Sequence, residues 1–105
     1  MKEITVQQLK QMRDAGESFQ LIDVREQWEV DVCSIGAKHI PMGEILGRIN
    51  ELKKDVPVII HCRSGGRSAN VINALEIQLG LENLHNLKGG ILAWAREIDQ
   101  SLEQY

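Results

Sequence analysis

The 105-residue sequence predicts an α/β domain built on a small, open and mainly parallel sheet. Short apolar runs alternate along the chain with amphipathic segments, as expected of strands joined by helices. The run at 56–62, VPVIIHC, is β-branched and nearly all apolar, which is typical of a central parallel strand covered on both faces. Because no internal repeat or linker rich in proline, glycine or serine divides the chain, we expect one domain over residues 1–105.

In the first half of the chain, the expected helices alternate with strands. Thr5 and Gln8 fit a capping box at the start of a helix, and Ala15-Gly16 is a plausible stop for it. The next three elements are a buried strand over 19–24 (FQLIDV), a short helical turn over 26–31 (EQWEVD) and a brief strand over 37–41 (AKHIP).

The second half continues the alternation. A helix is expected from about residue 42 to 53, before the strand at 56–62. A further helix opens at Arg67 or Ser68 and ends at Gly80, a residue suited to a helix C-terminus. The last elements are a strand over 83–87 (NLHNL) and a closing helix over 89–102. With right-handed crossovers, these segments place helices against the faces of the sheet.

Composition narrows the classes of partner. The formal charge of −3 comes from interspersed acidic and basic residues without a basic block, so nucleic acid is not an expected partner. No window approaches the ~18 apolar residues of a membrane span, and the N-terminus lacks a signal peptide, so we expect a cytoplasmic protein without a membrane partner. Cys33 and Cys62 are the only cysteines, which indicates neither a disulfide framework nor a zinc site.

Cys62 is the strongest candidate for a reactive group. In open α/β sheets, ligands bind beyond the carboxyl ends of the strands, and Cys62 ends a strand just before a helix N-terminus. Gly65 and Gly66 permit a loop whose N–H groups turn inward, while Arg63 and Arg67 add positive charge. The helix N-terminus, the inward N–H groups and the two arginine charges all favour the thiolate form of Cys62. A fall of two units from a pKa of about 8.5 would raise the ionised fraction at pH 7 from ~3% to roughly three quarters.

Other candidates carry weaker signals. Cys33 lacks neighbouring charges and glycines, so it is interpreted as a packing residue. His61 precedes Cys62 on a strand and should point to the opposite face, as a structural residue behind the loop. His39 and His85 are too scattered to form a metal site with the cysteines. Trp94 lies at helical spacing with apolar neighbours and is expected in the core.

Asp23 and Arg25 lie at the carboxyl end of another predicted strand and could face the same crevice as Cys62. Asp23 would support the site by binding Arg67 or loop N–H groups through charge-assisted hydrogen bonds. The alternative is that Asp23 only caps the short helix that follows it.

The segments LIDVREQWE, IGAKHIP, VIIHCRSGGRS and LKGGILAWAREI occur in an order and spacing that resembles a single-domain rhodanese, a sulfurtransferase, over nearly the whole chain. The resemblance implies a five-stranded parallel sheet flanked by helices on both faces. It also implies Cys62 as the sulfur-carrying nucleophile. The active-site loop implied by the resemblance comprises Arg63, Ser64, Gly65, Gly66, Arg67 and Ser68.

A Cys-dependent phosphatase or arsenate reductase is the alternative enzyme class. Those enzymes have five residues between cysteine and arginine, whereas four separate Cys62 from Arg67 here. The shorter loop suits one sulfur atom better than a phosphoryl group with three equatorial oxygens. We therefore favour sulfur transfer by double displacement: Cys62 takes sulfur from a small anionic donor such as thiosulfate and passes it to cyanide or a thiol, with no cofactor. Arg63 would attract the donor. A third possibility is a carrier that relays persulfide sulfur for a partner protein.

Overall fold

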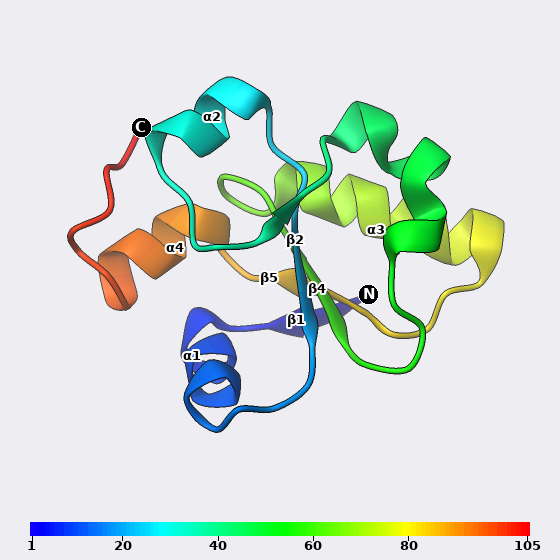
Figure 1. Cartoon of the computed structure of the whole chain (residues 1–105), viewed down its shortest axis with the longest axis horizontal. Helices are drawn as coiled ribbons and strands as arrows, with labels where there is room; N and C mark the ends of the chain where they lie inside the picture. The colour runs from blue at the N-terminus through cyan, green and yellow to red at the C-terminus, as the bar shows by residue number, and fades with distance from the viewer.

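The computed structural model describes residues 1–105 and contains a five-stranded sheet in which every neighbouring pair of strands is parallel (Figure 1). The strand order across the sheet is β1-β5-β4-β2-β3. The strands are β1 (Lys2–Ile4), β2 (Gln20–Asp23), β3 (Lys38–His39), β4 (Val58–His61) and β5 (Leu84–Leu87). This arrangement confirms the predicted α/β fold with a mainly parallel sheet.

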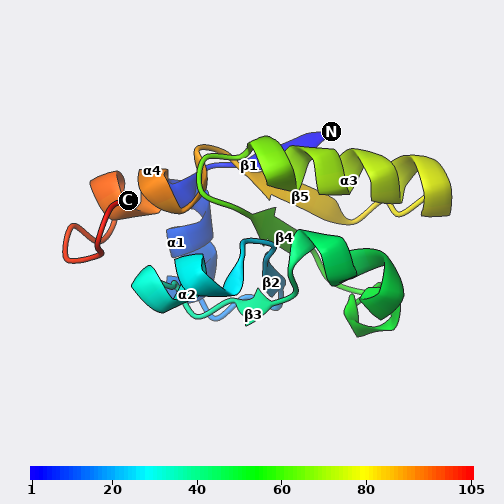
Figure 2. The ribbon, with the colours of Figure 1, turned by 90° about the horizontal axis from the view of Figure 1, so that it is seen from above.

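Helices cover both faces of the sheet. In Figure 1, α1 (Val6–Asp14) and α4 (Gly90–Glu97) lie on one side of the strands, and α3 (Gly66–Leu79) lies on the other with η1 (Met42–Glu51). Figure 2 shows the same layers from above, with the sheet between them. The short helix α2 (Gln27–Val32) follows β2. None of these helices has the length and apolar character needed to cross a lipid bilayer.

Strand β4 divides the core in two. All four of its residues are buried, and their side chains alternate between faces. Ile60 packs with apolar residues beneath α3 and η1, whereas Ile59 packs with those beneath α1 and α4. Since each face of β4 is covered, a nearly continuous apolar run is the composition that this position requires.

The main differences from the sequence-based expectation concern β1, the segment 42–51, and the limits of α3 and α4. Strand β1 was not predicted, because it is a short edge strand in which only Ile4 is partly buried. The segment 42–51 is a 3₁₀ helix interrupted at Arg48, which has non-helical backbone angles. Helix α3 begins earlier, at Gly66. Helix α4 ends at Glu97, because the Asp99 carboxylate accepts hydrogen bonds from Ser101 and holds a turn there.

Candidate active site

Cys62 lies directly after β4, at the carboxyl edge of the sheet, and is buried. Its Sγ accepts hydrogen bonds from the N–H groups of Gly65 at 3.1 Å and Ser68 at 3.5 Å. The Ser68 hydroxyl is 3.4 Å from the same sulfur. The loop and the first turn of α3 therefore surround one sulfur atom with hydrogen-bond donors.

These donors change the ionisation of Cys62. Burial of the sulfur raises the pKa of the thiol, but the hydrogen bonds from Ser68, Gly65 and Ser64 outweigh burial, so the pKa lies below its usual value. The direction agrees with the prediction from sequence. The donors responsible are backbone N–H groups and a hydroxyl, an arrangement that stabilises an anion held in a fixed place.

Only one of the two loop glycines needs its special backbone freedom. Gly65 has φ +110°, the left-handed region that disfavours other residues, and this conformation aims its N–H at Cys62. Gly66 has no positive φ, and a Cβ there would meet nothing within 4 Å. Of the two glycines expected to permit this loop, only Gly65 thus uses a conformation that other residues avoid, and Gly66 begins α3.

The N-terminus of α4 closes the loop from the other side. Its Ile91 and Leu92 N–H groups donate to the carbonyl oxygens of Cys62 and Arg63 at 3.0 and 3.1 Å. Such a close approach leaves no room for a side chain at Gly90, where a Cβ would lie 2.5 Å from the Arg63 oxygen. Helix α4 therefore fixes the carbonyl groups of Cys62 and Arg63, while the N–H groups of Gly65 and Ser68 face the sulfur.

Arg67 forms an ion pair that the sequence did not indicate. Its guanidinium donates to both carboxylate oxygens of Glu29 in α2, each at 2.7 Å. The expected partner of Arg67, Asp23, does not contact it. Because the hydrogen bonds from Arg67 outweigh burial, the pKa of Glu29 falls to about 2. The pKa of Arg67 is raised by the same hydrogen bonds and, in smaller part, by the charge of Cys62.

Asp23 and Arg25 form a buried pair of their own. The Arg25 Nη2 and Asp23 Oδ2 atoms are 2.7 Å apart, and both side chains are almost completely buried. Asp23 does not cap α2 either, since Glu26 occupies that position. The expectation that Asp23 binds Arg67 or the loop is therefore corrected. Arg25 instead donates to the carbonyl oxygens of Glu29 and Cys33, so the pair supports the segment around α2.

His61 lies behind the loop, as predicted. It is fully buried, its Nδ1 is 3.2 Å from the Cys62 carbonyl oxygen, and its Nε2 is 3.6 Å from Asp23. Burial lowers the pKa of His61 more than the Asp23 charge raises it, so the ring is neutral at pH 7. The register explains the placement, because His61 is paired with Asp23 across β4 and β2.

The C-terminal residue Tyr105 packs against the same region. Its hydroxyl donates to Glu29 at 2.9 Å and accepts from Arg25 at 2.8 Å. Its ring stacks edge-on against Trp28, and its carbonyl oxygen accepts from Arg63 at 2.6 Å. The Arg63 guanidinium, expected to point outward toward a donor, instead lies over the Tyr105 ring.

Asn86 in β5 completes the polar contacts behind the sulfur. Its amide oxygen is 2.5 Å from the Ser68 hydroxyl, and its amide nitrogen donates to the Gly65 carbonyl at 3.2 Å. The side chain is buried, so it reaches the loop through the protein interior. One residue of β5 thus holds two residues of the loop that contact Cys62.

Cys33 and Trp94 pack as the sequence indicated. Both are buried in the apolar cluster that lies under α1 and α4. Cys33 also lies within 3.9 Å of the Arg25 guanidinium.

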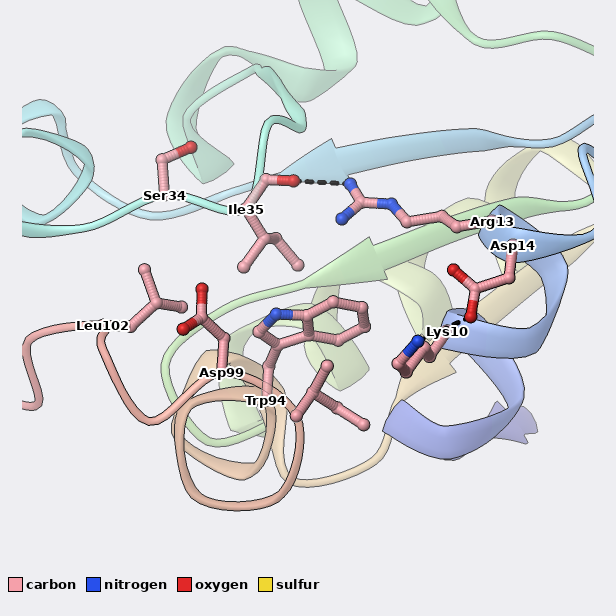
Figure 3. A pocket seen from close by; sticks show the side chains of 9 residues that line it. Lys10, Arg13, Asp14, Ser34, Ile35, Trp94, Asp99 and Leu102 are labelled. Carbon is pink, nitrogen blue, oxygen red and sulfur yellow. Dashed lines mark hydrogen bonds and ion pairs between the residues drawn. The ribbon is translucent and has the colours of Figure 1, made fainter.

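A separate cavity of about 390 Å³ lies between α1 and α4 (Figure 3). The Arg13 guanidinium lies over the Trp94 ring and donates to the Ile35 carbonyl oxygen there. Lys10 is paired with Asp14 at its rim. No residue of the loop 62–68 lines this cavity, so it is distinct from the candidate active site.

Four residues around the site were not predicted from the sequence: Glu29, Asn86, Gly90 and Tyr105. Glu29 had a usable signal, since it lies in the short helix after β2, at the same edge as Cys62. The pair Gly89-Gly90 at a helix start was a second signal for a close backbone approach. Asn86 and Tyr105 had none, because their contacts depend on how distant segments pack.

Comparison with known proteins gives consistent matches. The family model described as "Rhodanese-like domain" matches residues 5–97. "Putative sulfurtransferase YtwF" of Bacillus subtilis is 43% identical over 98 residues, which span 92% of this chain and 93% of the relative. "Putative sulfur carrier protein YrkF" of the same organism is 37% identical over 88% of this chain and 50% of its own length. The crystal structure of a rhodanese-like domain protein from Staphylococcus aureus superimposes with a TM-score of 0.82 at 34% identity, over 100% of this chain and 99% of that one.

Proposed function

Because the chain belongs to the rhodanese-like domain family, we propose that it is a thiosulfate sulfurtransferase that carries sulfur as a persulfide on Cys62. The donor is a small sulfur anion such as thiosulfate, and the acceptor is a thiol or cyanide. The observation that supports this most directly is the ring of donors around a single sulfur atom, with Gly65 N–H at 3.1 Å and Ser68 N–H at 3.5 Å. The proposed place of action is the cytoplasm.

The first half of the reaction is a displacement at sulfur. The Cys62 thiolate attacks the outer sulfur of thiosulfate, and a bond forms between Sγ and that sulfur. The bond between the two thiosulfate sulfur atoms breaks, and its electron pair leaves with sulfite. The persulfide that remains is anionic at neutral pH. The N–H groups of the loop stabilise this anion, as an oxyanion hole stabilises developing charge.

The second half restores the enzyme. A nucleophilic acceptor, cyanide or a thiolate, attacks the outer sulfur of the persulfide. The bond to Cys62 breaks, and its electron pair returns to Sγ as the thiolate. Because the nucleophile is already anionic and the leaving groups are stable anions, neither displacement needs a protein group that transfers a proton.

A test follows from the two cysteines of the chain. Incubation with thiosulfate should add one sulfur atom, about 32 Da, to the wild-type protein in intact-mass spectrometry. The matched variant Cys33→Ser should gain the same mass, and Cys62→Ser should gain none. A Cys62→Ser protein that still acquires the sulfur would exclude Cys62 as the carrier. Turnover of an aryl phosphate or arsenate, without sulfur transfer, would point to the phosphatase alternative.

A persulfide relay is the second candidate function, favoured by the similarity to a relative named as a sulfur carrier. In this role Cys62 receives sulfur from a partner protein and passes it to another. The two functions differ in the preferred donor. Fast steady-state transfer from thiosulfate to cyanide supports the enzyme. Slow transfer that becomes fast only with a persulfidated protein donor supports the relay.

A further inference from the structure

The Ser68 hydroxyl has more acceptors around it than it has protons to give. A serine hydroxyl donates one hydrogen bond. Three acceptors surround Ser68 Oγ: the Asn86 amide oxygen at 2.5 Å, the Gly65 carbonyl oxygen at 3.3 Å and the Cys62 sulfur at 3.4 Å. The hydroxyl is buried with the sulfur and with Asn86. The direction of its single proton therefore decides whether the Cys62 sulfur receives a hydrogen bond from Ser68.

The orientation of the Asn86 amide is fixed by the loop. A carbonyl oxygen can only accept, so the Asn86 atom that faces the Gly65 oxygen at 3.2 Å must be the nitrogen. The Asn86 oxygen then faces Ser68 Oγ. Since the amide oxygen has no hydrogen, the short contact between them requires Ser68 to donate. In this arrangement the lone pairs of Ser68 Oγ are free to accept from a Cys62 S–H group.

A thiolate or persulfide anion has no hydrogen to donate to Ser68. Its best partner is the Ser68 proton, which must leave Asn86 to reach the sulfur. We propose that Asn86 is a positioning residue for Cys62: its amide oxygen holds the Ser68 proton while Cys62 is a thiol, and the hydroxyl turns to the sulfur when Cys62 becomes an anion. No covalent bond is formed or broken in this rotation, which exchanges the hydrogen bond to Asn86 for one to the sulfur, and the thiol proton itself leaves to water. The consequence for sulfur transfer rests on the proposed function, but the effect on ionisation does not.

The charged group that acts on Cys62 is separate from this contact. Arg67 is the cation whose charge couples to the sulfur, and it is bonded to Glu29. His61 is on the opposite face of β4 and neutral. Changing Asn86 therefore leaves these neighbours in place. The change alters only the competition for the Ser68 proton and the bond to Gly65.

The test is the thiol pKa, measured from the pH dependence of iodoacetamide alkylation in a Cys33→Ser background, where only Cys62 reports. Asn86→Leu has a similar volume and no acceptor. It should lower the pKa of Cys62 by about half a unit to one unit, which corresponds to the loss of one competing hydrogen bond. The thiolate fraction at a pH below the pKa should then be about three to ten times larger. Asn86→Ala should give the same direction if Asn86→Leu does not fold.

The second residue supplies the control. In a Ser68→Ala background, where only the bond from Asn86 to Gly65 is left to lose, Asn86→Leu should shift the pKa of Cys62 much less. In a Ser68→Thr background, which keeps the hydroxyl, it should lower the pKa again. An equal shift with and without the hydroxyl, or no downward shift in the wild-type background, would overturn the proposal. Since the alkylation uses neither donor nor acceptor, it is independent of whether the wild-type protein gains sulfur from thiosulfate.

Discussion

The Arg67 guanidinium and the Glu29 carboxylate form two parallel hydrogen bonds, each 2.7 Å long. This pair ties the first turn of α3 to α2, two segments that are 38 residues apart in the chain. Glu29 also accepts hydrogen bonds from the Tyr105 hydroxyl and the Glu26 N–H. The carboxylate is buried, so its charge is held by the partners that surround it.

This arrangement predicts a pH-dependent contribution to stability. The pKa of Glu29 falls from 4.5 to about 2 on folding, because the hydrogen bonds from Arg67 outweigh burial. Because the pKa of Glu29 is lower in the folded protein, its carboxylate stabilises the fold at pH values above about 4.5, the unfolded pKa. This stabilisation is lost as the pH falls from about 4.5 toward 2. Glu29→Gln should lower the free energy of unfolding by up to about 2 kcal/mol at pH 7, because solvent at the one-third exposed Arg67 side chain screens part of the interaction. Urea titrations at pH 7 and pH 3 should show a smaller difference at pH 3. The control Glu103→Gln, at an exposed position, should leave the free energy of unfolding unchanged at both pH values. An equal loss for Glu29→Gln at pH 7 and pH 3 would contradict the lowered pKa of Glu29.

Gly90 should tolerate no side chain. A Cβ there would lie 2.5 Å from the Arg63 oxygen and 2.7 Å from the Cys62 oxygen, and its φ is +60°. We expect Gly90→Ala to cost at least about 2 kcal/mol in thermal or urea unfolding and to weaken sulfur transfer, because α4 must move away from the loop. Gly43→Ala is the matched control, since nothing lies within 4 Å of its Cβ position. Equal stability of the two variants would mean that α4 does not fix the loop.

His61 should not act as a general base. It is buried on the face of β4 away from the Cys62 side chain, and burial lowers its pKa so that it stays neutral. His61→Phe should retain sulfur transfer within about threefold, with the same pH profile, because removing a true base costs roughly a hundredfold or more. The measurement is initial rate against pH for a variant whose circular dichroism matches the wild type. A hundredfold loss in a folded variant would restore His61 as a candidate base.

Tyr105 should stabilise the region around α2 through its hydroxyl. Tyr105→Phe removes the hydrogen bonds to Glu29 and Arg25 but keeps the ring against Trp28. We expect a loss of about 1 kcal/mol in the free energy of unfolding. In a Glu29→Gln background the loss should be smaller, because the two residues share a hydrogen bond. Fully additive losses in this double-mutant cycle would show that the hydroxyl acts independently of Glu29.

Local rules were enough for the elements that carry the loop. The apolar, β-branched run before Cys62 can only be a buried strand in this context, and glycine and capping residues mark the helices beside it. The position of Cys62 at the carboxyl edge follows from that alternation. Strand β1 and the 3₁₀ helix η1 could not be predicted from local sequence. The pairing of an edge strand and the type of a helix depend more on the segments packed against them than on their own residues.

The sequence by itself determined the parallel α/β fold, the cysteine at the end of β4 and the length of the loop that follows it. Only the tertiary structure decided which charges and hydroxyls serve that cysteine. Glu29 rather than Asp23 binds Arg67, and Asn86 reaches Ser68 from another strand. The physical reason is the separation in sequence between the residues that interact. Secondary structure follows from residues a few positions apart, whereas a buried ion pair or hydrogen bond forms between whichever side chains the packed strands and helices bring within about 3 Å.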